Sequence, residues 1–120
     1  MKKTILLVED TEVLQADFIK RMASLNLDIR VASNGQVALM MLKAQPEIEL
    51  VVLDYSMPVM DGLRFLHERH LDPDLMKIPV VMCTSYPEAY PEFDVIRDRQ
   101  WALGFLPKQC RPQELMAYLG

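Results

Sequence analysis

Four polar positions in this chain follow four separate apolar runs, and their side chains could together receive a phosphoryl group. Asp54 follows the apolar residues 50–53 and precedes a segment with Pro and Gly. The other positions are the acidic pair Glu9–Asp10, the hydroxyl of Thr84 and the amine of Lys108. Neighbouring carboxylates repel one another and favour a hard divalent cation such as Mg²⁺, which prefers oxygen ligands. Phosphoryl transfer requires mainly positioning and neutralisation of charge. We therefore interpret these residues as the material of a metal-assisted phosphoryl acceptor.

Each of these residues also has a simpler structural explanation. An Asp after a strand is more often a turn former or a helix cap, and Glu9–Asp10 could serve only as a cap. Lys108 alone is most often a solvated surface residue, and Thr84 alone is most often a strand-end residue. The occurrence of all four after different strands favours the chemical interpretation.

The elements that must position these residues follow from the hydrophobic pattern. Apolar runs predict strands, and apolar residues at helical spacing predict helices. The strands are expected at residues 4–8, 29–31, 49–53, 79–83 and 105–106, and the helices at 12–25, 37–42, 62–70, from about 92, and from 112 to the end. This alternation predicts an α/β fold, a doubly wound five-stranded parallel sheet with flanking helices. Ligands of such sheets bind beyond the carboxyl ends of the strands, where all four polar positions fall.

Size and composition narrow the classes of function. A chain of 120 residues that is 51% apolar predicts one compact domain over residues 1–120, whether it stands alone or is excised from a longer protein. The net charge of -4 argues against direct binding of nucleic acid. The first apolar run stops at Glu9, too early for a secretory signal, and no run is long enough for a membrane span. Two cysteines and no disulfide framework favour a cytoplasmic setting.

Several segments carry a family resemblance. They read ILLVED at residues 5–10, VLDYSMPVMDG at residues 52–62 and PVVMCTS at residues 79–85, followed by Lys108. This pattern resembles the receiver domain of two-component response regulators, the family that includes the chemotaxis response regulator. The resemblance extends over about residues 3–119 and implies a flavodoxin-like sheet with strand order 2-1-3-4-5.

The resemblance implies a role for each site residue. Asp54 matches the aspartate that is phosphorylated by a sensor histidine kinase or a histidine phosphotransfer protein. Asp10 matches a direct Mg²⁺ ligand and Glu9 its water-mediated neighbour, while Asp54 and the main-chain carbonyl of Ser56 complete the metal site. Lys108 matches the lysine that binds the phosphoryl group. Such a domain assists its own phosphorylation and dephosphorylation but is not an enzyme with a separate substrate.

The resemblance also implies a conformational switch. Thr84 matches the switch hydroxyl and Phe105 the switch aromatic residue, which change the face made by the fourth helix, fifth strand and fifth helix. That face would bind a downstream output domain or protein, and a homodimer through it stays open. Ser56 and Tyr86 match positions that tune the lifetime of the phosphoryl group, so Tyr86→Ala is expected to hasten its loss.

The chain also departs from the family pattern. The family usually has Lys-Pro with a cis bond, whereas Gln109 follows Lys108 here. A cis bond before a residue other than proline costs about 2.5–4 kcal/mol, which favours a trans bond and a repositioned lysine loop. Trp101 could pack in the core or mark an interface. His67 and His70 lie three apart on a helix, and we interpret them as surface residues rather than metal ligands.

Two other functions compete with the phosphorylated switch. The altered lysine loop allows an interaction module that keeps the fold but switches weakly or atypically. A small hydrolase of the haloacid dehalogenase type also uses a strand-end Asp nucleophile. That class expects a second Asp two residues later, where this chain has Ser56.

Overall fold

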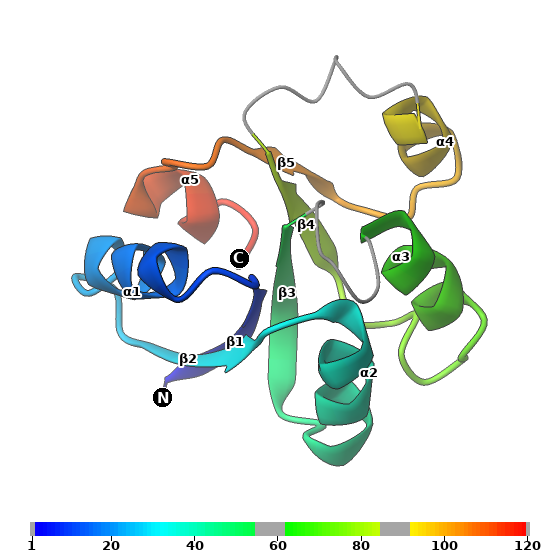
Figure 1. Cartoon of the computed structure of the whole chain (residues 1–120), viewed down its shortest axis with the longest axis horizontal. Coiled ribbons are helices and arrows are strands. Elements are labelled where there is room, and N and C mark those ends of the chain that lie inside the picture. Colours follow the sequence, from blue (N-terminus) through cyan, green and yellow to red (C-terminus); the bar gives the residue numbers. More distant parts are fainter. Residues whose placement is uncertain (1, 55–61, 85–91, 120) are drawn as a thin grey trace.

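The structure is a computed structural model that describes residues 2–54, 62–84 and 92–119. Strands and helices alternate along the chain, as the hydrophobic pattern predicts (Figure 1). The strands are β1 Lys3–Val8, β2 Leu27–Ala32, β3 Ile48–Asp54, β4 Val80–Cys83 and β5 Gly104–Leu106. The helices are α1 Glu12–Arg21, α2 Gly35–Ala44, α3 Gly62–His70, α4 Glu92–Asp98 and α5 Pro112–Met116.

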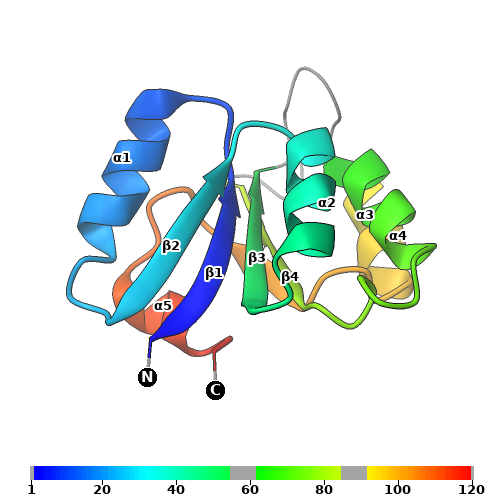
Figure 2. The same ribbon diagram turned by 90° about the horizontal axis from the view of Figure 1, so that it is seen from below.

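The five strands form one parallel sheet in the order β2-β1-β3-β4-β5. This confirms the predicted fold class and strand order. Helices α1 and α5 lie on one face of the sheet, and α2, α3 and α4 lie on the other, as the two perpendicular views show (Figures 1 and 2). The chain therefore has three layers, with a core on each face of the sheet.

Alternation of side chains along the strands divides the two cores. On β1, Ile5 and Leu7 pack into the core under α1 and α5, whereas Leu6 and Val8 pack into the core under α2, α3 and α4. Successive side chains of a strand point to opposite faces, so a strand covered on both sides must be apolar at every position. The continuous apolar runs of the sequence have this physical cause.

Two helices are shorter than predicted. The first helix was expected to reach residue 25, but α1 ends at Arg21 and the chain continues in turns with i→i−3 hydrogen bonds. Leu25 still packs against the core, because such turns keep side chains on nearly the same side as a helix does. The last helix was expected to reach the chain end, but α5 ends at Met116. Leu119 then donates its amide to the carbonyl of Met116, again in i→i−3 geometry.

Trp101 belongs to the core rather than to an interface. Its side chain is buried, and the rings of His67 and His70 both lie 5.7 Å from it. The buried side chain of Arg69 anchors the same region, since its guanidinium donates to the carbonyls of Ile78 at 3.0 Å and Trp101 at 3.4 Å. His67 and His70 are exposed on α3, as expected for surface residues.

Candidate functional site

The carboxyl end of the sheet brings the acidic residues together. Strand register places Val8 beside Leu53, so the next residues, Glu9 and Asp54, are neighbours across β1 and β3. Asp54 is the last residue of β3 rather than the first residue after it. One carboxylate oxygen from each of Glu9, Asp10 and Asp54 lies within 4.8 Å of the others. Two chain segments, one after β1 and one at the end of β3, thus supply a compact set of oxygen ligands.

Lys108 reaches into this acidic group. Its Nζ lies 2.5 Å from Oδ1 of Asp54 and 3.2 Å from Oε1 of Glu9. Both carboxylates are buried, whereas the lysine side chain is about one-third exposed (31%). The ammonium therefore offsets charge that burial would otherwise make unfavourable.

The pKa values of Glu9 and Lys108 reflect burial and the neighbouring charges. Burial, followed by the charge of Asp54, raises the pKa of Glu9 above its ordinary value, although Lys108 acts in the opposite direction. Burial alone would lower the pKa of Lys108, but its hydrogen bond to Asp54 and the charges of both carboxylates outweigh this and raise it. The site favours cations, because one ammonium faces three carboxylates.

The donor set fits Mg²⁺. Carboxylate oxygens are the ligands that this hard ion prefers, and it commonly uses one or two of them while water and phosphate oxygens complete its shell. Asp10 is exposed, so a ligand reaches it from solvent. Oε2 of Glu9 accepts a hydrogen bond from the amide of the N-cap residue Thr11 at 3.3 Å, whereas Oε1 faces Lys108, so a local contact at the start of α1 accounts for only one oxygen of this carboxylate.

Thr84 and Phe105 connect the site to β5. The amide of Thr84, just after β4, donates to the carbonyl of Leu106 at 2.9 Å. Phe105 is the preceding residue of β5, half-buried, and the guanidinium carbon of Arg97 lies 4.9 Å from the centre of its ring. A concavity of about 630 Å³ beside α4 and β5 includes both Phe105 and Arg97. The two predicted switch residues are thus connected through β5, by the hydrogen bond of Thr84 to Leu106, the residue after Phe105. Their roles as switch residues stay predictions.

The Lys108–Gln109 peptide bond is trans. The sequence favoured this geometry and suggested that the lysine loop would be repositioned. The ammonium nevertheless reaches Asp54, so the trans bond is compatible with a lysine in the acidic site. The predictions for Ser56 and Tyr86 concern residues outside the described ranges.

Sequence reasoning missed the residues that hold the site from α1. Nε2 of Gln15 donates to the carbonyl of Glu9 at 2.6 Å, and Arg21 contacts the loop that carries Lys108. Asp17 and Arg21 also line a cavity of about 20 Å³ together with Glu9, Asp54 and Lys108. No sequence signal identifies these residues, because Gln15 and Arg21 both donate to backbone carbonyls, which have no side-chain pattern.

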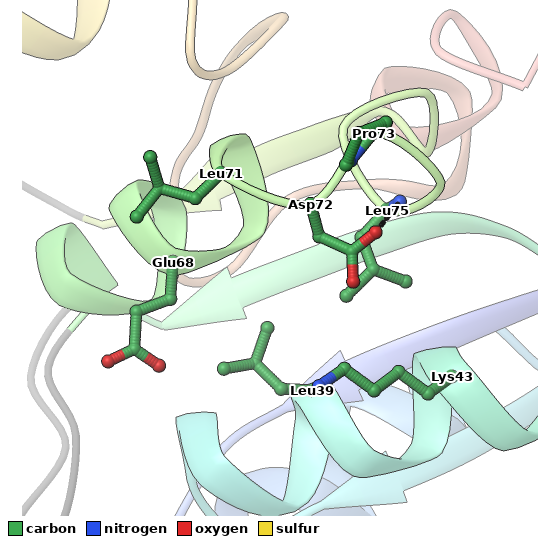
Figure 3. A pocket seen from close by; sticks show the side chains of 7 residues that line it. All are labelled: Leu39, Lys43, Glu68, Leu71, Asp72, Pro73 and Leu75. Atoms are coloured by element: carbon green, nitrogen blue, oxygen red, sulfur yellow. Dashed lines mark hydrogen bonds between the residues drawn. The ribbon is translucent and has the colours of Figure 1, made fainter.

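A separate concavity lies between α2 and α3 (Figure 3). Its volume is about 550 Å³, and Leu39 and Lys43 from α2 face Glu68 from α3 and the turn that contains Asp72. It shares no lining residue with the acidic site. Among the described residues, no helix combines the length and apolar character that crossing a membrane requires.

Comparison with known proteins identifies the family and agrees with the fold. The family described as "Response regulator receiver domain" matches residues 5–120. A protein-glutamate methylesterase/protein-glutamine glutaminase of Rhodospirillum centenum is 31% identical over 92% of this chain, which spans only 28% of that relative. The two-component response regulator ORR11 of Oryza sativa subsp. indica is 30% identical, with 92% of this chain and 74% of the relative covered.

A solved structure shows the same likeness in three dimensions. The N-terminal domain of a response regulator receiver protein from Methanoculleus marisnigri JR1 superposes with a TM-score of 0.77 and 28% identity. The superposition covers 97% of this chain and 92% of that one. The chain therefore belongs to the response regulator receiver domain family.

Proposed function

We propose that this chain, over residues 1–120, is a magnesium-dependent aspartyl phosphoacceptor in a two-component phosphorelay. The observation that carries the proposal is the contact of Lys108 with Asp54, 2.5 Å apart, beside the carboxylates of Glu9 and Asp10. A structural cap or turn former has no need of a lysine brought from 54 residues away. An acceptor of a phosphoryl group needs this counter-charge.

The reaction follows from these residues. An oxygen of Asp54 forms a bond to phosphorus while the P–N bond of a phosphohistidine breaks, and the leaving imidazole nitrogen keeps the electron pair and takes up a proton from solvent. Lys108 stabilises negative charge on the phosphoryl oxygens, and the hydroxyl of Thr84 donates to one of them. Mg²⁺, held by Glu9, Asp10, Asp54 and the carbonyl of Ser56, would neutralise the charge of the incoming group.

The proposed output is a change of the face formed by α4, β5 and α5. The hydrogen bond between Thr84 and Leu106 connects the acceptor edge to β5. A phosphoryl group that attracts the Thr84 hydroxyl would shift this strand end and the neighbouring ring of Phe105. A local charge change would thereby bias which partners the face binds.

The partners follow from the same chemistry. The phosphodonor is a sensor histidine kinase or a histidine phosphotransfer protein, and an output domain or protein binds the α4–β5–α5 face. Val13, which is 75% exposed in the first turn of α1, offers an apolar contact for such a donor. The domain acts in the cytoplasm and turns over no separate substrate.

Intact mass tests the acceptor. The protein is incubated with Mg²⁺ and acetyl phosphate, alone and with EDTA. Wild type should gain one phosphoryl group only with Mg²⁺, Asp54→Asn should gain none, and the exposed control Asp74→Asn should behave as wild type. No gain in wild type, or an equal gain in Asp54→Asn, would refute the proposal.

Amide NMR separates a switch from an interaction module that does not switch. On addition of Mg²⁺ and beryllofluoride, a phosphoryl mimic, the amides of Phe105 and Leu106 should shift in wild type. Shifts confined to residues around Asp54 would favour the interaction module instead. The placement of Lys108 on Asp54 supports the switch, because a displaced lysine loop was the reason to expect weak switching.

A further inference from the structure

The loop that carries Lys108 is held from outside by one side chain of α1. Nη1 of Arg21 donates to the carbonyl of Lys108 at 3.2 Å and to the carbonyl of Cys110 at 3.1 Å. The loop also closes on itself, since the amide of Cys110 donates to the carbonyl of Pro107 at 3.1 Å. One guanidinium therefore donates to the carbonyls of Lys108 and Cys110, which flank Gln109.

Arg21 is itself oriented by its helix. Its Nη2 pairs with Asp17, one turn earlier on the same face of α1. The Arg21 side chain is 21% exposed, so it is largely enclosed between α1 and the loop. An exposed helical ion pair contributes little to stability by itself. The planar fork of a guanidinium can donate to Asp17 and to the loop at once, which a lysine ammonium on a flexible stem does less well.

The position of this contact links it to the acceptor. The carbonyl that Arg21 holds belongs to the residue whose Nζ lies on Asp54 and Glu9. Arg21 and Lys108 also line the same small cavity. We propose that Arg21 is a positioning residue: it holds the backbone of Lys108 so that its ammonium stays on Asp54.

The residue after Lys108 explains why this restraint matters. Proline at this point would fix the backbone through its ring, but Gln109 leaves φ free. Two hydrogen bonds from Arg21 restrict the same segment from outside. The positioning itself rests on the hydrogen bonds of Arg21 and Lys108, whereas its value for phosphoryl transfer rests on the function proposed above.

The first test uses metal-free protein and does not depend on phosphorylation. The ¹⁵N signal of the Lys108 ammonium should be visible in wild type, because its hydrogen bonds to two carboxylates slow exchange with water. Arg21→Met should broaden or abolish it, and Arg21→Lys should restore it in part. Asp17→Asn, which leaves the loop contacts in place but removes the orienting carboxylate, should give an intermediate result. Fluorescence of Trp101 verifies that each variant is folded.

A matched control removes the same charge from the same turn of α1. Lys20 is exposed and adjacent to Arg21, so Lys20→Met should leave the Lys108 signal unchanged. An unchanged signal in Arg21→Met would overturn the proposal. Equal losses in Arg21→Met and Lys20→Met would also overturn it, because they would indicate a general effect of charge rather than positioning.

The second test measures the rate of phosphorylation by acetyl phosphate at saturating Mg²⁺. Arg21→Met should lower this rate about tenfold, the equivalent of about 1.4 kcal/mol, while Lys20→Met stays within about twofold of wild type. A lost ammonium signal with an unchanged rate would overturn the claim that the positioning serves phosphoryl transfer. If wild type is not phosphorylated at all, the proposed function fails, and the ammonium signal still decides the role of Arg21.

Discussion

Replacement of Lys108 by methionine should destabilise the metal-free protein at neutral pH and much less in acid. The change leaves Glu9 and Asp54, with side chains 7% and 9% exposed, without the ammonium between them. Removal of one partner from a fully buried ion pair costs about 3–5 kcal/mol. Because Lys108 is 31% exposed, solvent screens part of this, and we expect a loss of about 2–3 kcal/mol at pH 7.

The pH dependence follows from the sign of the pKa shifts. The folded protein binds the Glu9 proton more tightly than the unfolded chain, so stability from this group decreases as pH rises from 4.5 through the raised pKa. The variant should show this decrease more strongly, because the lowering effect of Lys108 is gone. In wild type, the contribution of Lys108 is present below 10.5 and is lost as pH rises through its raised pKa.

Urea unfolding in EDTA measures these effects. Trp101 is the one tryptophan of the chain and packs on the opposite face of the sheet from α1, so its fluorescence reports global unfolding. Lys108→Met should lose about 2–3 kcal/mol at pH 7, less than about half of that at pH 4.5, and recover stability when Mg²⁺ replaces EDTA. Lys20→Met serves as the control. Equal stability of Lys108→Met and wild type at pH 7, or equal losses at both pH values, would refute the reasoning.

Three further predictions concern residues that support the fold. Arg69→Met should cost about 2–3 kcal/mol in urea unfolding, because buried carbonyls lose a charged donor; a change below about 0.5 kcal/mol would contradict this. Gly104→Ala should cost about 1–2 kcal/mol, since its Cβ would clash with the Tyr118 hydroxyl oxygen. A second change, Tyr118→Phe, should recover part of this loss, and no recovery would show that the hydroxyl is not the cause. Cys83 and Cys110 should resist iodoacetamide at pH 8 in the native protein, as measured by intact mass, because both are buried and burial raises the pKa of Cys83 to about 12; rapid labelling would argue against this.

Most of the fold was predictable, because buried strands appear in the sequence as continuous apolar runs. The third helix was expected at residues 62–70 and spans Gly62–His70. The ends of α1 and α5 were not predictable, since i→i−3 turns continue the apolar spacing of the preceding helix. Val13 and Leu14 of α1 are exposed although both are apolar, which the hydrophobic pattern alone does not predict.

The residues that form the acidic site could be predicted from the sequence, but the contacts that hold them in place could not. Parallel strands all present their carboxyl ends at one edge, so residues after four strands had to meet there. The contributions of Gln15 and Arg21 were not predictable, because each bonds to backbone carbonyls, and a carbonyl has no sequence signature.

The sequence by itself determined the sheet, its coverage by helices on both faces, and the identity of the charged groups at its carboxyl edge. The cause is local: apolar runs form strands, and the polar residues after them can only lie at the strand ends. Only the tertiary structure decided that the ammonium of Lys108 lies on Asp54 with a trans bond before Gln109. That placement depends on Arg21, 87 residues earlier in the chain, whose two hydrogen bonds to the loop exist only after α1 packs on the sheet.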